Sequence, residues 1–150
     1  SGASPFDSRG TRGVRLCPEK PSRKDLVKGA PHIHPTVMFR RDAIEPLGGY
    51  PTSKNTIRCE DLDLWYRFYA SGFKGYNLQE PLLYYRESII DYKRRTVKNS
   101  INMAKTMLKG YRLNKIPLGY YIITLKPIAS SMLPRKLLLK YHHIKDSINQ

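Results

Sequence analysis

The sequence predicts a mixed α/β (α+β) fold, followed by a mostly helical, basic extension. Up to about residue 90, short apolar runs are bounded by Gly and Pro, which is typical of short strands and helices. Beyond that point, apolar residues recur at helical spacing. Charge divides the chain in the same way, because residues 91–150 contain 13 Lys or Arg and two Asp, whereas residues 31–90 contain seven of each sign. We therefore expect two regions, residues 1–90 and 91–150, with the second packed on the first.

In the first region the elements are expected to be short. Residues 1–13 are rich in Gly, Ser and Arg and are predicted to form a loop. Ser22 is a suitable N-cap for a short helix, and Gly48 and Gly49 should stop another. The predicted strands cover residues 13–16, 36–39, 75–78 and 82–86, and the predicted helices cover 23–27, 42–47 and about 60–71.

The extension is predicted to begin with a long basic helix, residues 92–108, which Gly110 ends. An apolar helical segment follows at 118–125. Pro127 should kink or restart the chain, and a last segment is expected at 135–144.

The most informative stretch is the start of the helix at about residue 60. Glu60, Asp61 and Asp63 fall in its first turn, where the positive end of the helix dipole favours ionised carboxylates. An ionised carboxylate held on a rigid helix start can act as a general base. The alternative is that these acids only cap the helix and match its dipole.

Several short motifs surround this helix in a fixed order. They are His34-Pro35-Thr36-Val37-Met38-Phe39, Leu47-Gly48-Gly49-Tyr50, Glu60-Asp61-Leu62-Asp63-Leu64-Trp65, Gly72-Phe73-Lys74 and Glu80-Pro81-Leu82. In order and spacing, residues 8–90 resemble the second half of a family 2 glycosyltransferase domain of the GT-A fold. The resemblance implies a partial GT-A-like mixed sheet with flanking helices. It also implies inverting transfer of a sugar from a nucleotide-diphospho-sugar to a polysaccharide or lipid-linked acceptor, in bacterial surface polysaccharide assembly.

The resemblance also implies roles for individual residues. Asp61 matches the family's catalytic base, and Glu60 is its supporting neighbour. His34 precedes the segment that underlies the cleft and is a candidate for lining the site. Arg58 and Arg86 could each bind a diphosphate, because guanidinium groups bind phosphate oxygens bidentately. Trp65 could stack on a sugar, although its helical spacing also fits a core position.

A metal site is not expected within this chain. Members of the family bind the donor through an N-terminal βαβ region and an Asp-x-Asp motif that holds Mg or Mn, and nothing in this sequence resembles that region. Asp61 and Asp63 have the same spacing but match the base motif instead. The chain is therefore predicted to be the acceptor-side part of an enzyme and incomplete alone, with the Mg or Mn held mainly by other residues.

The basic extension leaves three possibilities open: nucleic-acid binding, contact with an anionic membrane, or a helical cap on the catalytic region. No nucleic-acid-binding module is recognisable, so we expect capping and membrane contact and no nucleic-acid partner. A non-enzymatic basic module or an inactive scaffold fragment is the alternative to an enzyme. With two cysteines and no signal-peptide pattern, the expected location is the cytoplasm, including the inner face of the plasma membrane.

Overall fold

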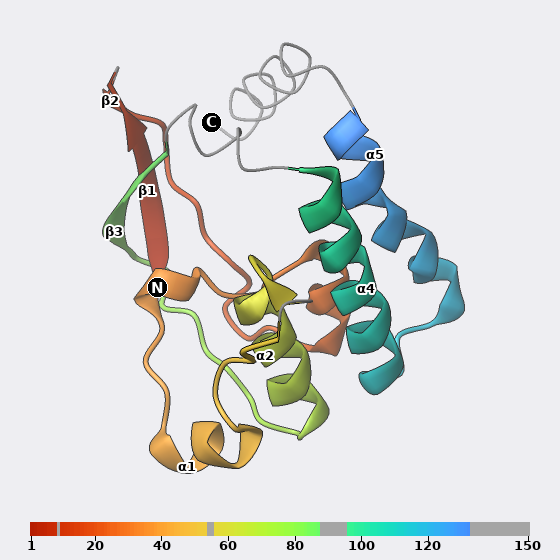
Figure 1. Cartoon of the computed structure of the whole chain (residues 1–150). Coiled ribbons are helices and arrows are strands. Elements are labelled where there is room, and N and C mark those ends of the chain that lie inside the picture. Colours follow the sequence, from red (N-terminus) through yellow and green to blue (C-terminus); the bar gives the residue numbers. More distant parts are fainter. Residues whose placement is uncertain (9, 54–55, 88–95, 133–150) are drawn as a thin grey trace.

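The computed structural model describes residues 1–8, 10–53, 56–87 and 96–132. A small sheet forms one side of the molecule, helices α2 and α4 lie beside it, and η5 and α5 lie beyond α4 (Figure 1). The sheet has the order β2-β1-β3, in which β1 (Gly2–Asp7) is antiparallel to β2 (Gly10–Thr11) and parallel to β3 (Pro81–Arg86). The predicted mixed α/β fold with a small mixed sheet is therefore confirmed, and the GT-A fold stays a prediction.

The first strand corrects the predicted loop at residues 1–13. Gly, Ser and Pro have low strand propensity, so the local pattern gave no sign of β1. The strand forms because its backbone pairs with β3, about 80 residues away, as in the hydrogen bond of 2.8 Å from the Gly2 N–H to the Glu80 carbonyl. A side chain at Gly2 would overlap Leu16, so this strand end needs a glycine. The strand predicted at 13–16 contributes only one bridge, between Ala3 and Arg15.

Two other predicted strands are wrong. The segment 36–39 begins inside the 3-10 helix η2 (His34–Thr36) and continues as irregular chain, where the Phe39 ring packs 5.3 Å from the Trp65 ring. The segment 75–78 is also irregular, because the buried Asn77 side chain donates to the carbonyls of Pro18 and Pro31 instead of facing a sheet. In the first segment, Val37 and Phe39 pack against the core, whereas in the second Tyr76 and Leu78 are exposed, so neither apolar pattern reflects strand pairing.

The predicted helices of the first region are confirmed with small shifts. Ser22 precedes η1 (Arg23–Lys28). The Asp25 carboxylate accepts two hydrogen bonds of 2.9 Å, from the backbone N–H and from the hydroxyl of Ser22. Next come α1 (Arg41–Ile44) and η3 (Glu45–Leu47), which ends at Gly48 in the left-handed conformation. The acidic helix is α2 (Glu60–Ala70).

The long helix of the second region is α4 (Val97–Leu113), and Gly110 does not end it. Gly110 lies inside the helix because a Cβ there would overlap the Tyr66 ring of α2. The next elements are η5 (Leu118–Leu125) and α5 (Lys126–Met132), so Pro127 stands at a helix start, where its missing N–H costs nothing. Residues 92–95 and the segment predicted at 135–144 lie outside the described residues.

The core lies where η1, α2 and α4 meet. Leu26, Trp65, Tyr66 and Tyr111 are each at most 1% exposed. Tyr111 donates a hydrogen bond of 3.1 Å to the Val27 carbonyl, which joins α4 to η1. Residues on both sides of position 90 thus build one core, and this core holds α2 in place. In the described part of the chain, no helix is long and apolar enough to cross a lipid bilayer.

Candidate active site at the start of helix α2

An open pocket of about 500 Å³ lies at the N-terminal end of α2. It brings together residues from three segments: η2, the Gly48-Gly49 turn and the helix start. The lining residues are His34, Tyr50, Arg58, Glu60 and Asp61. Four of the six residues that the sequence singled out therefore lie around one pocket, and Tyr50 joins them.

The two acids at the helix start are held in different ways. The Glu60 carboxylate accepts a hydrogen bond of 2.9 Å from the backbone N–H of Arg58. Arg58 has a φ of 66°, which is unusual for a residue with a side chain, so Glu60 stabilises a strained turn. One oxygen of Asp61, Oδ1, accepts from the Leu62 N–H at 2.8 Å. The described residues form no hydrogen bond with the other oxygen.

Tyr50 and His34 form the opposite side of the pocket. The Tyr50 hydroxyl lies 2.8 Å from Nε2 of His34, and the two rings meet edge to face at 5.5 Å. Partial burial, and then the negative charge of Asp61, raise the pKa of Tyr50, so the phenol stays protonated at neutral pH. The sequence analysis did not select Tyr50, although its place in the Gly-Gly-Tyr motif was a signal that could have found it.

Arg67 fixes the turn that carries Tyr50. Its Nε lies 2.7 Å from Oδ2 of Asp63, one turn earlier on α2. Its other nitrogens donate to the carbonyl of Leu47 and, at 2.8 Å, to that of Gly49. The sequence analysis missed this residue, and the available signal was the i, i+4 spacing of Asp63 and Arg67 on a predicted helix.

Two predicted substrate-binding residues do not line the pocket. Trp65 is 1% exposed and packs in the core, with its ring 4.4 Å from that of His32. This is the core position that its helical spacing also allowed. Arg86 lies on β3, with its guanidinium 5.5 Å from the Phe6 ring.

His32 forms a hydrogen bond near the C-terminal end of α2, away from the helix start. Its Nδ1 lies 2.7 Å from Oδ1 of Asn77, and its Nε2 lies 2.9 Å from the Tyr69 hydroxyl. Because the amide oxygen can only accept, Nδ1 donates to it, and the neutral ring accepts from Tyr69 through Nε2. Burial lowers the pKa of His32 and raises that of Tyr69 to about 12, and both shifts favour these neutral forms.

The described residues do not fit a metal ion. No group of three or more His, Cys, Asp or Glu within them could hold one. Asp63, which has the spacing of a ligand beside Asp61, is instead paired with Arg67 and lies 3.6 Å from Nζ of Lys109.

Two curated relatives are similar to the chain. It is 41% identical over 137 residues to "Putative glycosyltransferase EpsE" of Bacillus subtilis (strain 168), a match that covers 91% of this chain and 49% of that protein. It is 34% identical over 110 residues to the UDP-Gal:alpha-D-GlcNAc-diphosphoundecaprenol beta-1,3-galactosyltransferase of Escherichia coli, over 70% of this chain and 39% of that protein. The chain is related in sequence to glycosyltransferases.

This glycosyltransferase-related chain spans about half the length of the first relative and less of the second. No family model matches it, and the search of solved structures gave no significant match. The resemblance noted in the sequence is thus confirmed at the level of glycosyltransferases, while family 2 and the inverting mechanism stay predictions.

Proposed function

We propose that this chain forms the acceptor-side part of an inverting glycosyltransferase, in which Asp61 is the catalytic base. The observation that supports this most directly is the pocket at the start of α2, where Asp61 lies beside Tyr50, His34 and Arg58 and one of its carboxylate oxygens forms no hydrogen bond with the described residues. The name of the Escherichia coli relative specifies a UDP-Gal donor and a lipid-diphosphate acceptor. We accordingly propose a nucleotide-diphospho-sugar donor and a lipid-linked or polysaccharide acceptor for this chain.

In the proposed reaction, an acceptor hydroxyl binds next to Asp61. The carboxylate takes the hydroxyl proton as the acceptor oxygen attacks the anomeric carbon of the donor. The bond from that carbon to the diphosphate breaks, and the nucleoside diphosphate leaves on the opposite face, which inverts the anomeric centre. The hydrogen-bonded pair of Tyr50 and His34 would orient the acceptor, and the exposed Arg58 would supply positive charge near the departing diphosphate.

A Mg or Mn ion remains part of the proposal for the complete enzyme only. Following the family resemblance, we propose that it is held mainly by residues outside this chain, and we assign it no step. A lipid-linked acceptor would place the enzyme at the cytoplasmic face of the plasma membrane, which is the location we propose.

The test is Asp61→Asn in the complete enzyme, with Asp42→Asn as the matched control, because Asp42 is an exposed carboxylate on α1 outside the pocket. We expect Asp61→Asn to lower turnover about 10²–10⁴-fold, the usual range for losing a positioned base. Nucleotide-sugar binding, measured by calorimetry, should change little, and the control should keep its activity. Turnover near that of the wild type for Asp61→Asn would refute the assignment.

A further inference from the structure

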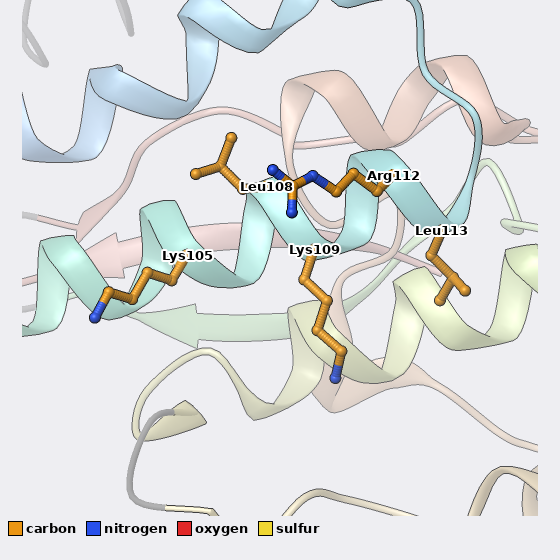
Figure 2. A pocket seen from close by; sticks show the side chains of 5 residues that line it. All are labelled: Lys105, Leu108, Lys109, Arg112 and Leu113. Atoms are coloured by element: carbon orange, nitrogen blue, oxygen red, sulfur yellow. The ribbon is translucent and has the colours of Figure 1, made fainter.

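A second open hollow, of about 550 Å³, lies on α4 and is lined by Lys105, Leu108, Lys109, Arg112 and Leu113 (Figure 2). Lys109 approaches Asp63 of α2. Within the described part of the chain, neither Lys105 nor Arg112 has a carboxylate at ion-pair distance, and both side chains are exposed. Among the described residues, two of the three cations that line the hollow therefore have no carboxylate partner.

The helical hairpin of α4, η5 and α5 carries no negative side chain of its own. Residues 96–132 contain six Lys or Arg and no Asp or Glu. Salt at about 0.1 M screens exposed charges only beyond a distance of about 10 Å, so several cations close to an anionic surface attract it together.

The second arm of the same hairpin exposes large aliphatic side chains. Leu118 is 81% exposed, Ile122 72%, Leu125 55% and Met132 76%, although η5 and α5 pack along α4. Single exposed apolar residues are common, whereas grouped ones are typical of surfaces that contact a membrane or another protein.

We propose that the hairpin of α4, η5 and α5 docks on an anionic phospholipid bilayer. In this arrangement the cations that line the α4 hollow bind lipid phosphates, and the aliphatic side chains of η5 and α5 enter the interfacial layer. Attachment is peripheral, since no described helix is long and apolar enough to span a bilayer. This inference does not depend on the transferase reaction.

A bilayer fits this surface better than a nucleic acid does. Nucleic acid would match the cations, but single strands are held on aromatic stacking platforms and duplexes through phosphates and base edges. Neither interaction would bury Leu118, Ile122 and Met132. An anionic bilayer provides phosphates and an apolar layer together, which match the cations and the exposed aliphatic side chains of the hairpin.

The experiment is cosedimentation of the 150-residue chain with vesicles, with circular dichroism as the check that each variant is folded. We expect binding to vesicles that contain phosphatidylglycerol and little binding to pure phosphatidylcholine. Raising the salt concentration should weaken binding. Binding that duplex or single-stranded DNA abolishes would overturn the proposal in favour of a nucleic-acid site, and no vesicle binding at low salt would overturn it in favour of a structural cap.

Paired variants test whether the surface is local. Lys105→Gln with Arg112→Gln should weaken vesicle binding about 25-fold, at about fivefold for each charge. The control, Lys20→Gln with Lys24→Gln, removes the same charge from exposed residues elsewhere and should have a much smaller effect. Equal losses from the two pairs would show that net charge alone drives binding and would refute a defined surface.

The aliphatic contribution has its own control. Leu118→Ser with Ile122→Ser should weaken binding by about tenfold or more, because both side chains leave the interfacial layer. Met38→Ser with Leu82→Ser removes two aliphatic side chains that are 96% and 63% exposed on other segments, and it should leave binding unchanged. If the first pair also leaves binding unchanged, the hairpin does not insert and the proposal fails.

Discussion

Helices α2 and α4 pack against each other, but they differ in whether their charged side chains have hydrogen-bond or ion-pair partners. On α2, Asp63 and Arg67 pair with each other, and the carboxylates of Glu60 and Asp61 accept backbone hydrogen bonds. On α4, Lys105 and Arg112 have no carboxylate partner within the described residues. Hydrogen-bond and ion-pair partners fix the orientation of a charged side chain, so α2 can hold a carboxylate in place for chemistry. Lys105 and Arg112 of α4 are instead exposed and can bind an external anion.

The two groups of charged residues should also contribute differently to the stability of the fold. Breaking a largely buried, hydrogen-bonded ion pair leaves an uncompensated charge and is expensive, whereas an exposed pair contributes about 0–1 kcal/mol. Substitutions in the α2 network should therefore reduce stability, and those on the outer face of α4 should hardly do so.

The largest expected effect comes from Arg67→Met. It leaves the buried Asp63 carboxylate without its closest partner and frees the carbonyls of Leu47 and Gly49. We expect a loss of about 3 kcal/mol in the free energy of unfolding, measured in urea. The hydrogen bond between Tyr50 and His34 should also weaken, which NMR of the His34 ring nitrogens would detect.

Arg41→Met is the matched control for that change. Arg41 also pairs with a carboxylate four residues away, Glu45, but both side chains are more than half exposed. Its loss should cost about 0.3–0.5 kcal/mol. Similar losses for the two variants would contradict the view that the α2 pair is a structural clamp.

The second prediction concerns the contact between the two helices. Gly110→Ala should destabilise the protein by about 1–3 kcal/mol, because the new Cβ would overlap the buried Tyr66 ring. Alanine normally stabilises a helix relative to glycine by about 1 kcal/mol, so the expected sign is opposite to helix propensity. Gly119→Ala is the control, since open space surrounds that glycine, and it should be neutral. Thermal unfolding of both variants decides between packing and propensity.

Gly110 also illustrates which features local sequence patterns could not predict. Local signals were sufficient for α2, whose acids, apolar spacing and closing Gly72 lie within one short stretch, whereas His34 was selected only through the family resemblance and Tyr50 was not selected. They were insufficient for Gly110, because a glycine that ends a helix and one that admits a neighbouring ring look alike in sequence. They also failed for β1, whose partner is about 80 residues away, and for Arg67, whose carbonyl acceptors are set by tertiary packing.

The third prediction is a pH dependence that belongs to the α2 side, since residues 96–132 contain no histidine. Burial lowers the pKa of His32 in the folded protein below its ordinary value of 6.5. Below that pH the unfolded chain binds a proton that the folded protein resists, so stability falls as the pH falls from 6.5 toward the folded pKa. The slope for this one group is at most about 1.4 kcal/mol per pH unit.

Urea unfolding at a series of pH values between neutral and mildly acid conditions would measure that slope. His32→Gln should reduce the slope while keeping a side chain that can bond to Asn77 or Tyr69. An unchanged slope in this variant would show that other groups cause the acid sensitivity.

The smallest effect is expected for a substitution of Lys109, the α4 residue that pairs with Asp63 of α2. Its Nζ lies 3.6 Å from Oδ1 of Asp63, but its side chain is 70% exposed, so water and salt screen the pair. Lys109→Met keeps most of the aliphatic stem and should cost less than about 1 kcal/mol at low salt and almost nothing at high salt. The loss from Arg67→Met should persist in the same salt, since that ion pair is largely buried. If salt reduced both losses equally, the contrast between a fixed network on α2 and a solvated surface on α4 would be wrong.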